Sequence, residues 1–407
     1  MPTAVPEVPS SNQIAAEGAR LRVAIEKPLP PMRIAEALAA AIARWRRRDF
    51  AQRTQAIARV SRNLGFSIEL LEESLDALLL PFTSGALKEA ASHAKEAREV
   101  MAFVMAGNVM GAGLLEVALA LMAGAAVLIK TASREPVFFS EFADTLIKED
   151  PEVGSRFAVL TWPRERIDLT HAQRAACDLI VVYGDDSTID ALGRGIFGFG
   201  SRLSAAIVAR SAISHGEADQ VARLLARDVT LFEQLGCLSP HHIFVQGDED
   251  AALNFAERLG AAMRQWAQRL PSPAVLELED AAALRSARET ARWRSIAGEP
   301  VRVIEGPGLS WVVIFDRDAP LTPSPGLRCV RVSAIADPRD LRSRLEPAHG
   351  RIEAFAVAAE GGEDSTLRGL LHEIGVSYVA RPGAMQSPPL TWRHGGGAFL
   401  NRVTMRR

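Results

Sequence analysis

The chain has 407 residues, of which 24% are charged and 48% hydrophobic, and its formal net charge is −2. This balance gives no electrostatic reason to expect nucleic acid or an anionic membrane as a partner, and the length predicts two domains. Three cysteines that lie far apart, Cys177, Cys237 and Cys329, argue against both a disulfide framework and a metal site, so we expect a cytoplasmic protein with reduced thiols.

The N-terminal region divides into two parts by composition. Residues 1–30 are polar and contain several prolines, so we expect an extended arm, and no secretory signal is visible. Residues 32–80 are rich in Ala, Leu and Arg at helical spacing, which predicts helices packed on the first domain.

The segment from Met101 to Ile129 carries one formal charge, at Glu116, and has the hydropathy of a membrane span. Glycines interrupt it, however, and the pattern predicts a strand over 100–105, a helix over 114–122 and a strand over 125–129. Gly124 would end the helix as its C-cap. We therefore expect a buried unit of a parallel sheet and no membrane span, with Glu116 facing solvent or a basic partner.

The strand and helix pattern then repeats along the chain. It predicts a helix over 137–148, strands over 156–161 and 178–183 with a short helix at 169–176 between them, and a further strand over 204–209. The turn 184–188 precedes a helix predicted at 189–194, an arrangement suited to binding phosphate. Neither GxGxxG nor GxxxxGK[ST] is present at these turns, so spacing alone leaves the ligand undetermined.

Cys237 lies in the segment that contains most of the candidate catalytic side chains. It follows Gly236 after a helix predicted over 218–232, and a strand is predicted over 243–246. An isolated cysteine is more often a small core residue than a nucleophile. Cys237 alone lies on a Gly-flanked turn where backbone N–H groups can stabilise an anion. His241 and His242 could act as bases, but surface or strand-start roles are favoured.

The remaining sequence predicts a second α/β layer. It contains a helix over 251–270 and strands over 301–315, 327–332 and 353–359. The Gly- and Pro-rich tail 382–397 suggests an excursion onto the first domain or onto a partner subunit. Trp392 and His394 in that tail could border a substrate site, although simple packing of the tail is favoured. The expected domains are 1–232 for the arm, helices and dinucleotide-binding domain, 233–385 for the catalytic domain and 386–407 for the tail.

Five motifs occur in the order found in the aldehyde dehydrogenase superfamily: AGNVMG, ALMAGAAVLIK, VVYGDDSTID, GSRLSAAIV and FEQLGCLSPHHIFV. Together with the C-terminal ARPGAMQSPPLTWRHGG, they resemble most closely its LuxC-like branch, the acyl-CoA (fatty acid) reductases. The resemblance implies an α/β fold of aldehyde dehydrogenase type, with a Rossmann-type dinucleotide-binding domain and a second α/β catalytic domain. It also implies a nicotinamide cofactor bound without GxGxxG.

The resemblance assigns roles to individual residues. Cys237 matches the catalytic cysteine, and Asn108 matches the asparagine that forms the oxyanion hole with the Cys237 backbone N–H. Lys130 matches the lysine that contacts the cofactor ribose. The turn expected to approach the cofactor pyrophosphate consists of Gly184, Asp185, Asp186, Ser187 and Thr188. From the residues alone, Asn108 would be a turn former and Lys130 a polar strand end.

Two departures from the superfamily pattern refine the expected activity. The glutamate that activates water in acid-forming relatives falls near Phe199 here, and residues 191–216 contain no Asp or Glu. This favours NAD(P)H-dependent reduction of an acyl-CoA or acyl-protein thioester to an aldehyde through an acyl-cysteine. The alternatives are oxidation of free aldehydes to acids, reduction of an acyl phosphate and a non-catalytic dinucleotide-binding protein.

The second departure concerns the cofactor. Ser133 stands where NAD-preferring relatives place a glutamate, and Lys130 or Arg134 could pair with a 2′-phosphate. We therefore expect NADPH, with NADH as the alternative because Glu135 lies only two residues beyond Ser133. The resemblance also suggests a homo-oligomer and a partner protein that transfers the acyl group.

Overall fold

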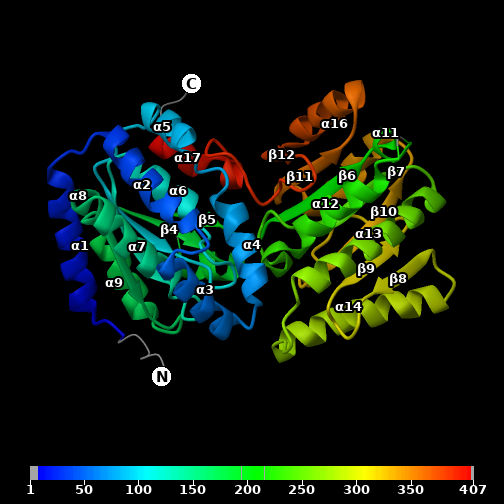
Figure 1. Cartoon of the computed structure of the whole chain (residues 1–407), viewed down its shortest axis with the longest axis horizontal. Coiled ribbons are helices and arrows are strands. Elements are labelled where there is room, and N and C mark those ends of the chain that lie inside the picture. The colour runs from blue at the N-terminus through cyan, green and yellow to red at the C-terminus, as the bar shows by residue number, and fades with distance from the viewer. Residues whose placement is uncertain (1–7, 194, 215, 405–407) are drawn as a thin grey trace. The chain divides into compact units, whose positions relative to one another are not determined.

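The computed structural model describes residues 8–404 except 194 and 215. The chain forms two compact units (Figure 1). The first comprises Met1–Leu64, Leu78–Ser201 and Pro389–Arg407, and the second comprises Gly65–Ala77 and Arg202–Pro388. The larger segment of the second unit begins at Arg202 and not at residue 233, because the strand that follows Arg202 pairs within the second sheet.

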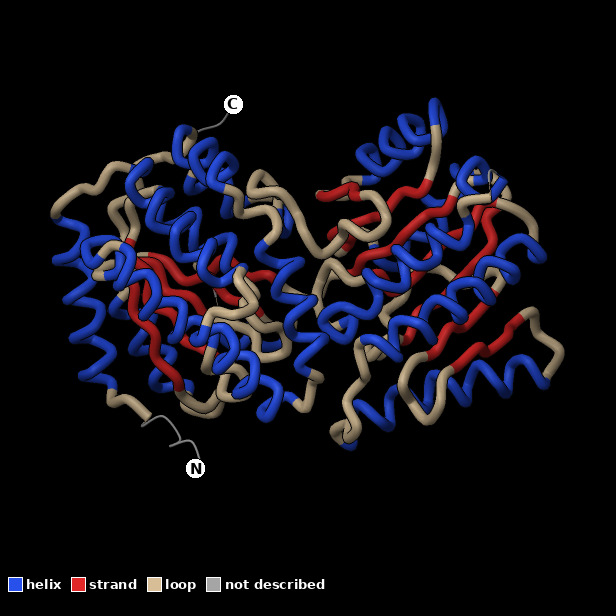
Figure 2. Tube along the Cα trace, in the orientation of Figure 1, coloured by secondary structure: helices blue, strands red, loops and turns tan. Residues whose placement is uncertain are grey.

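The first unit contains a five-stranded sheet in the order β3-β2-β1-β4-β5, and all its pairings are parallel (Figure 2). Its strands are β1 (Val100–Val104), β2 (Ala126–Thr131), β3 (Phe157–Thr161), β4 (Leu179–Tyr183) and β5 (Ile196–Phe199). The chain runs from β1 outward to β3 and returns to β4 on the other side of β1. This reversal between β1 and β4 is where doubly wound sheets bind ligands, outside the carboxyl ends of the strands.

Helices pack against the strands of this sheet. Helices α1 and α9 pack on one another and on the sheet through a core that includes Leu21, Leu128 and Trp162. Helices α6 and α7 follow β1 and β2 and contact β2 and β3, respectively. The helices of this unit are α1 (Ser11–Glu26), α2 (Pro31–Arg46), α3 (Ala51–Leu64), α5 (Ser84–Ser92), α6 (Leu114–Met122), α7 (Phe138–Glu149), α8 (Pro151–Gly154), α9 (Ile167–Ala176), α10 (Asp186–Leu192), η4 (His394–Gly396) and α17 (Ala398–Val403).

The prediction of an extended arm over residues 1–30 is wrong for much of its length, and residues 1–7 lie outside the described part. Helix α1 begins with a capping box in which Ser10 and Gln13 exchange hydrogen bonds between side chain and backbone. Its buried face carries Ile14, Leu21 and Ile25 at helical spacing. The prolines on either side of this segment obscured the helical periodicity in the sequence. The helix is stable because its apolar face packs against the sheet.

The apolar stretch from Met101 to Ile129 forms strand, turn, helix and strand, as predicted. Strand β1 pairs in parallel with β2, and Gly124 ends α6 with a φ of +90°. Every residue of β1, α6 and β2 is buried, Glu116 included. Among the described residues, no helix has the length and apolar character needed to cross a bilayer.

The second unit contains a seven-stranded sheet in the order β12-β11-β6-β7-β10-β9-β8, in which only the β8–β9 pairing is antiparallel. Its strands are β6 (Leu203–Val208), β7 (Pro240–Gln246), β8 (Val301–Glu305), β9 (Val312–Asp316), β10 (Cys329–Ile335), β11 (Ile352–Ala358) and β12 (Tyr378–Ala380). The single strand predicted over 301–315 is in fact β8 and β9, because a turn at Gly306–Ser310 reverses the chain.

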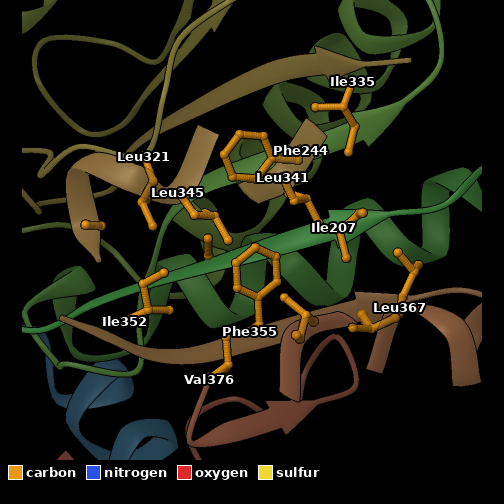
Figure 3. Close-up of a cluster of buried hydrophobic side chains, with 14 of the residues drawn as sticks. Ile207, Phe244, Leu321, Ile335, Leu341, Leu345, Ile352, Phe355, Leu367 and Val376 are labelled. Carbon is orange, nitrogen blue, oxygen red and sulfur yellow. The ribbon is translucent and has the colours of Figure 1, made fainter. Parts of the chain in front are cut away.

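Apolar side chains on one face of this sheet form a continuous core (Figure 3). Ile207, Phe244 and Phe355 come from the adjacent strands β6, β7 and β11, and Leu341 and Leu367 cover them from two helices. The helices of this unit are α4 (Ile68–Leu79), α11 (Arg210–Ser214), α12 (Ala218–Thr230), η1 (Leu231–Gln234), α13 (Glu249–Arg269), α14 (Leu278–Ile296), η2 (Pro338–Asp340), α15 (Leu341–Leu345), η3 (Glu346–Ala348) and α16 (Gly361–Ile374). The last two residues of α4 belong to the first unit.

Candidate active site

Cys237 lies on the turn between η1 and β7 and is partly buried. The hydroxyl of Ser204, at the start of β6, donates to the Cys237 carbonyl at 2.7 Å and accepts from the Ala354 N–H at 3.1 Å. Within the turn, the Ser239 N–H donates to the Gly236 carbonyl at 3.0 Å. These bonds fix the cysteine turn to the beginnings of two neighbouring strands.

The backbone just before the cysteine turn adopts a conformation that is rare for residues with a side chain. Phe232, Glu233 and Gln234 have φ values of 57°, 52° and 60°. Left-handed backbone costs such residues about 1–2 kcal/mol each, so the surrounding structure must impose it. The Gln234 side-chain amide does so by donating to the carbonyls of Pro240 and Cys329 at 2.8 and 2.9 Å.

A buried ion pair holds the same segment. The guanidinium of Arg328 binds both carboxylate oxygens of Glu233, and the two side chains are 0% and 1% exposed. Arg328 also donates to the Leu270 carbonyl at 2.8 Å, and the Leu327 N–H donates to the Glu233 carbonyl at 2.8 Å. The fork geometry of the pair suits a site with little tolerance for movement. No local sequence pattern could indicate this pair, because its partners lie 95 positions apart.

The other two cysteines are poor candidates for a nucleophile. Burial raises the pKa of both Cys177 and Cys329 to about 12. Both therefore remain protonated at neutral pH, and a neutral thiol is a weak nucleophile. Cys237 differs from both in its place on a turn, and its role as the nucleophile stays a prediction.

The two histidines after the cysteine have structural partners. His241 Nδ1 lies 2.8 Å from the Ser324 hydroxyl, and His242 Nε2 lies 2.8 Å from the Ser333 hydroxyl. Burial lowers the pKa of His241 to about 4 and that of His242 well below its ordinary value. Both rings are therefore neutral at pH 7 and belong to β7, as the favoured strand-start role predicts.

Asn108 lies on the loop between β1 and α6, where its side chain is exposed. Gly111 and Gly113 give this loop its path, with φ values of +79° and +87°. A Cβ atom at Gly113 would lie 3.0 Å from the Met105 sulfur and 3.1 Å from the Tyr183 ring. Only glycine fits this close approach without displacing a neighbour.

The segment after β2 turns one carboxylate inward and two polar side chains outward. Ser133 and Arg134 are exposed, whereas Glu135 is 3% exposed and accepts from the N–H groups of Val137 and Phe138 at 3.0 and 2.9 Å. Burial raises the pKa of Glu135 to about 7 against these hydrogen bonds. Its carboxylate thus caps α7 and is not directed to a ligand.

Lys130, the fifth residue of β2, is 6% exposed, and its ammonium lies 6.0 Å from the centre of the Trp162 ring. Burial lowers the pKa of Lys130, while the nearby charge of Glu165 opposes that change. This environment suits a lysine that meets a ligand at the end of the strand.

The turn after β4 differs from expectation in one respect. Helix α10 begins at Asp186 and not at residue 189, because the Asp185 carboxylate accepts from the Thr188 N–H at 2.7 Å and from the Ser187 hydroxyl at 2.8 Å. The Asp186 carboxylate accepts from the Ser201 N–H at 3.0 Å. Asp185 therefore occupies the position at this short helix that an anionic ligand would take.

Within the first unit, the fold brings the candidate residues to one edge of the sheet. The loop carrying Asn108 follows β1, Lys130 lies near the end of β2, and Gly184 follows β4. In a parallel sheet these positions share the carboxyl edge. In the part of the chain that the structure describes, no cluster of three His, Cys, Asp or Glu side chains could hold a metal ion.

Comparison with known protein families identifies the chain. The family model described as acyl-CoA reductase (LuxC) matches residues 86–406, which is most of the sequence. The chain belongs to the LuxC family. Two curated relatives are named long-chain acyl-protein thioester reductase. The one from Aliivibrio fischeri is 23% identical over 331 residues, covering 73% of this chain and 66% of that protein. The one from Photorhabdus laumondii is 23% identical over 248 residues, covering 53% and 51%. This chain thus spans less than two thirds of either relative.

Solved structures with a similar fold include aldehyde dehydrogenases. A putative aldehyde dehydrogenase from Burkholderia cenocepacia has a TM-score of 0.72 at 14% identity, covering 93% of this chain and 85% of that one. Succinic semialdehyde dehydrogenase from Streptococcus pyogenes, in complex with NADP+, has a TM-score of 0.69 at 13% identity, covering 92% and 88%. These similarities confirm the predicted two-domain aldehyde dehydrogenase fold of this LuxC-family chain.

The sequence interpretation undervalued one group in this LuxC-family chain. His394, on the C-terminal segment of the first unit, lies with Nδ1 2.8 Å from Glu116 Oε1. Its ring stacks on Phe199, the last residue of β5, with ring centres 3.9 Å apart, and on Trp392 at 4.2 Å. Glu116 thus has the basic partner expected for it. The sequence could point only to Trp392 and His394, which lie close together in the tail. Their partners Glu116 and Phe199 are far away in the sequence, so no local pattern connects them.

Proposed function

We propose that this LuxC-family protein uses NADPH to reduce a long-chain acyl thioester, carried by coenzyme A or by a protein, to the aldehyde. The observation that carries the proposal is the place of Cys237 on a turn that hydrogen bonds fix to two neighbouring strands, whereas burial raises the pKa of the other two thiols, Cys177 and Cys329. The names of the two relatives support a thioester as the substrate class.

The reaction can be written in balanced steps on this cysteine. The Cys237 thiolate attacks the acyl carbonyl, the carbon–sulfur bond to the carrier breaks, and the carrier leaves as a thiolate. When bound, the nicotinamide cofactor would supply the hydride that reduces the acyl-enzyme. The resulting thiohemiacetal oxyanion expels Cys237 and becomes the aldehyde, so the thiolate is regenerated. Asn108 and the Cys237 N–H would stabilise the oxyanion of both addition steps, a contribution of about 3 kcal/mol per donor.

The residues that follow β2 fit a cofactor with a 2′-phosphate. Ser133 and Arg134 are exposed there, and Lys130 lies at the same strand end. Glu135 is the carboxylate that would repel a phosphate, but its side chain is buried as a helix cap. A serine donor and an arginine cation favour the phosphorylated ribose. The pyrophosphate would need groups other than the Thr188 N–H, which Asp185 engages.

Oxidation of free aldehydes to acids is the main competing function. The residue at the position expected for a water-activating base, in the first unit, disfavours this function. Hydrolysis of an acyl-enzyme needs a base that activates water. The position expected for that base is near Phe199, which is apolar, buried and covered by the His394 ring. An acyl-enzyme protected from water would persist until hydride adds to its carbonyl carbon or another thiol takes up the acyl group.

The proposal is tested by intact-mass measurement of the protein after incubation with a long-chain acyl-CoA. Wild type should gain one acyl group, and addition of NADPH should remove it and release the aldehyde. Cys237→Ala should show neither event, whereas Cys177→Ala, the matched control, should behave as wild type. An adduct that persists in Cys237→Ala, or acid as the product in place of aldehyde, would contradict the proposal.

A further inference from the structure

We infer that Gln386 is a positioning residue, which fixes the direction of the Cys237 N–H so that it can stabilise the oxyanion of the acyl thioester. This inference rests on the proposed function, because it assigns a residue to the addition steps of that reaction. It concerns residues of the second unit only. It also gives a role to the C-terminal motif ARPGAMQSPPLTWRHGG, which contains Gln386.

The direction of the Cys237 N–H depends on the turn that carries it. Cys237 and Leu238 are the central residues of this turn, and the Ser239 N–H closes it by donating to the Gly236 carbonyl at 3.0 Å. The peptide between Gly236 and Cys237 is trans, so its N–H and its C=O point in opposite directions. The hydrogen bond from Ser239 therefore sets the direction of the Cys237 N–H.

The side-chain amide of Gln386 holds the last residue of this turn. Its nitrogen donates to Ser239 Oγ and to the Asp228 carbonyl, at 3.0 Å in each case. A backbone carbonyl can only accept, so the nitrogen of the amide, and not its oxygen, must face Asp228. Gln386 and Ser239 are both buried, so water competes little for these hydrogen bonds.

The two acceptors of Gln386 lie on either side of the strained segment, residues 232–234. Asp228 belongs to the last turn of α12, where backbone carbonyls lack partners within the helix. Ser239 lies beyond the three residues with left-handed backbone. The hydrogen bonds of Gln386 therefore oppose a relaxation of the strain that would move the cysteine turn away from α12.

The loop that carries Gln386 is itself fixed to α12. The Asp228 carboxylate accepts from the Gly383 N–H at 2.6 Å, and the Arg227 guanidinium donates to the Gly383 carbonyl at 2.9 Å. A Cβ atom at Gly383 would lie 2.8 Å from Leu224 Cδ2, so a side chain would not fit at this approach. An amide on a loop held in this way can define the position of the turn.

Capping of α12 accounts for only one of the two hydrogen bonds. The bond to the Asp228 carbonyl satisfies a group at the end of the helix, whereas the bond to Ser239 Oγ acts on the cysteine turn. Together they set the distance between helix and turn. An N–H that is held in place before the reaction begins stabilises an oxyanion without a cost of reorganisation.

The test compares two reactions of Cys237 in the full chain, both followed by intact mass. Acylation by a long-chain acyl-CoA passes through an oxyanion, whereas alkylation by iodoacetamide displaces iodide from a saturated carbon and forms none. Gln386→Met keeps the length of the side chain and removes its N–H donors. It should slow acylation at saturating acyl-CoA by about 10-fold, part of the roughly 10²–10³-fold that loss of an oxyanion donor costs. The alkylation rate and the half-saturating concentration of acyl-CoA should stay as in wild type.

Ser387→Ala is the matched control, because Ser387 Oγ donates to the Ala77 carbonyl at 2.7 Å and so holds the same loop to α4. This variant should acylate and alkylate as wild type does. Ser239→Ala removes the other partner of the Gln386 hydrogen bond and should show the same selective loss of acylation. The double variant of Gln386 and Ser239 should lose no more than either single variant, since both changes interrupt one interaction.

Three results would overturn the inference. Equal slowing of acylation and alkylation by Gln386→Met would mean that Gln386 only supports the turn. Acylation of that variant at the wild-type rate, or a raised half-saturating concentration with an unchanged limiting rate, would exclude a positioning role. If Gln386→Met does not fold, Ser239→Ala gives the same comparison. A wild-type protein that iodoacetamide alkylates at Cys237 but that gains no acyl group contradicts the proposed function itself, which separates the two failures.

Discussion

Replacing Arg328 with methionine should destabilise the second unit strongly, because it leaves the Glu233 carboxylate buried without its cation. The two side chains are 0% and 1% exposed and joined through both carboxylate oxygens. Removing one partner of such a pair typically costs about 3–5 kcal/mol. The left-handed backbone at residues 232–234 also loses a support, so the cysteine turn should move and acylation should slow.

The loss should depend on pH in a defined direction. Burial raises the pKa of Glu233, and Arg328 opposes that rise. In Arg328→Met the opposition is absent, so the pKa of the buried carboxyl rises further. A carboxyl whose pKa is higher in the folded state destabilises the fold increasingly as pH rises toward that folded value. The difference in stability from wild type should therefore be smaller at pH 5 than at pH 8.

Urea unfolding followed by tryptophan fluorescence measures this effect. Arg339→Met is the control, because Arg339 forms an exposed ion pair with Asp337 and should matter little. The double variant Glu233→Gln with Arg328→Met should be more stable than Arg328→Met alone, since no buried charge remains. Equal stability of the Arg328→Met and Arg339→Met proteins, or a loss that is greater at pH 5 than at pH 8, would refute the reasoning.

Three further predictions concern the first unit. Asn108→Ala should fold normally, because the side chain is exposed, but it should slow single-turnover reduction by about 10²-fold or more; an unchanged rate contradicts its role as an oxyanion donor. Ser133→Glu should weaken NADPH binding far more than NADH binding in titrations, whereas Ser140→Glu, an exposed control on α7, should not discriminate; equal losses for the two cofactors argue against the proposed phosphate site. Gly113→Ala should lower the unfolding free energy by about 1–2 kcal/mol, because its φ is +87° and the new methyl group meets Met105 and Tyr183; an unchanged urea midpoint would show that the loop accommodates it.

The sequence by itself determined the features that depend on neighbouring residues. The apolar stretch at 101–129 predicts β1, α6 and β2 because periodicity and glycine positions are local properties. The same reasoning selects Cys237 as the cysteine on a turn, and the structure keeps it there. The order of motifs identified the LuxC family although no single motif was decisive.

Only the tertiary structure decided the features that depend on distant partners. Helix α1 was mistaken for an extended arm because its apolar face is stabilised by α9 and the sheet, which lie far along the chain. Strand β6 was assigned with the first domain, but its hydrogen bonds join it to β7 and β11. The pairs Glu233–Arg328 and Glu116–His394 join positions 95 and 278 residues apart. Periodicity cannot reveal such contacts, because the free energy that offsets burial of a charge comes from a partner that only the fold brings close.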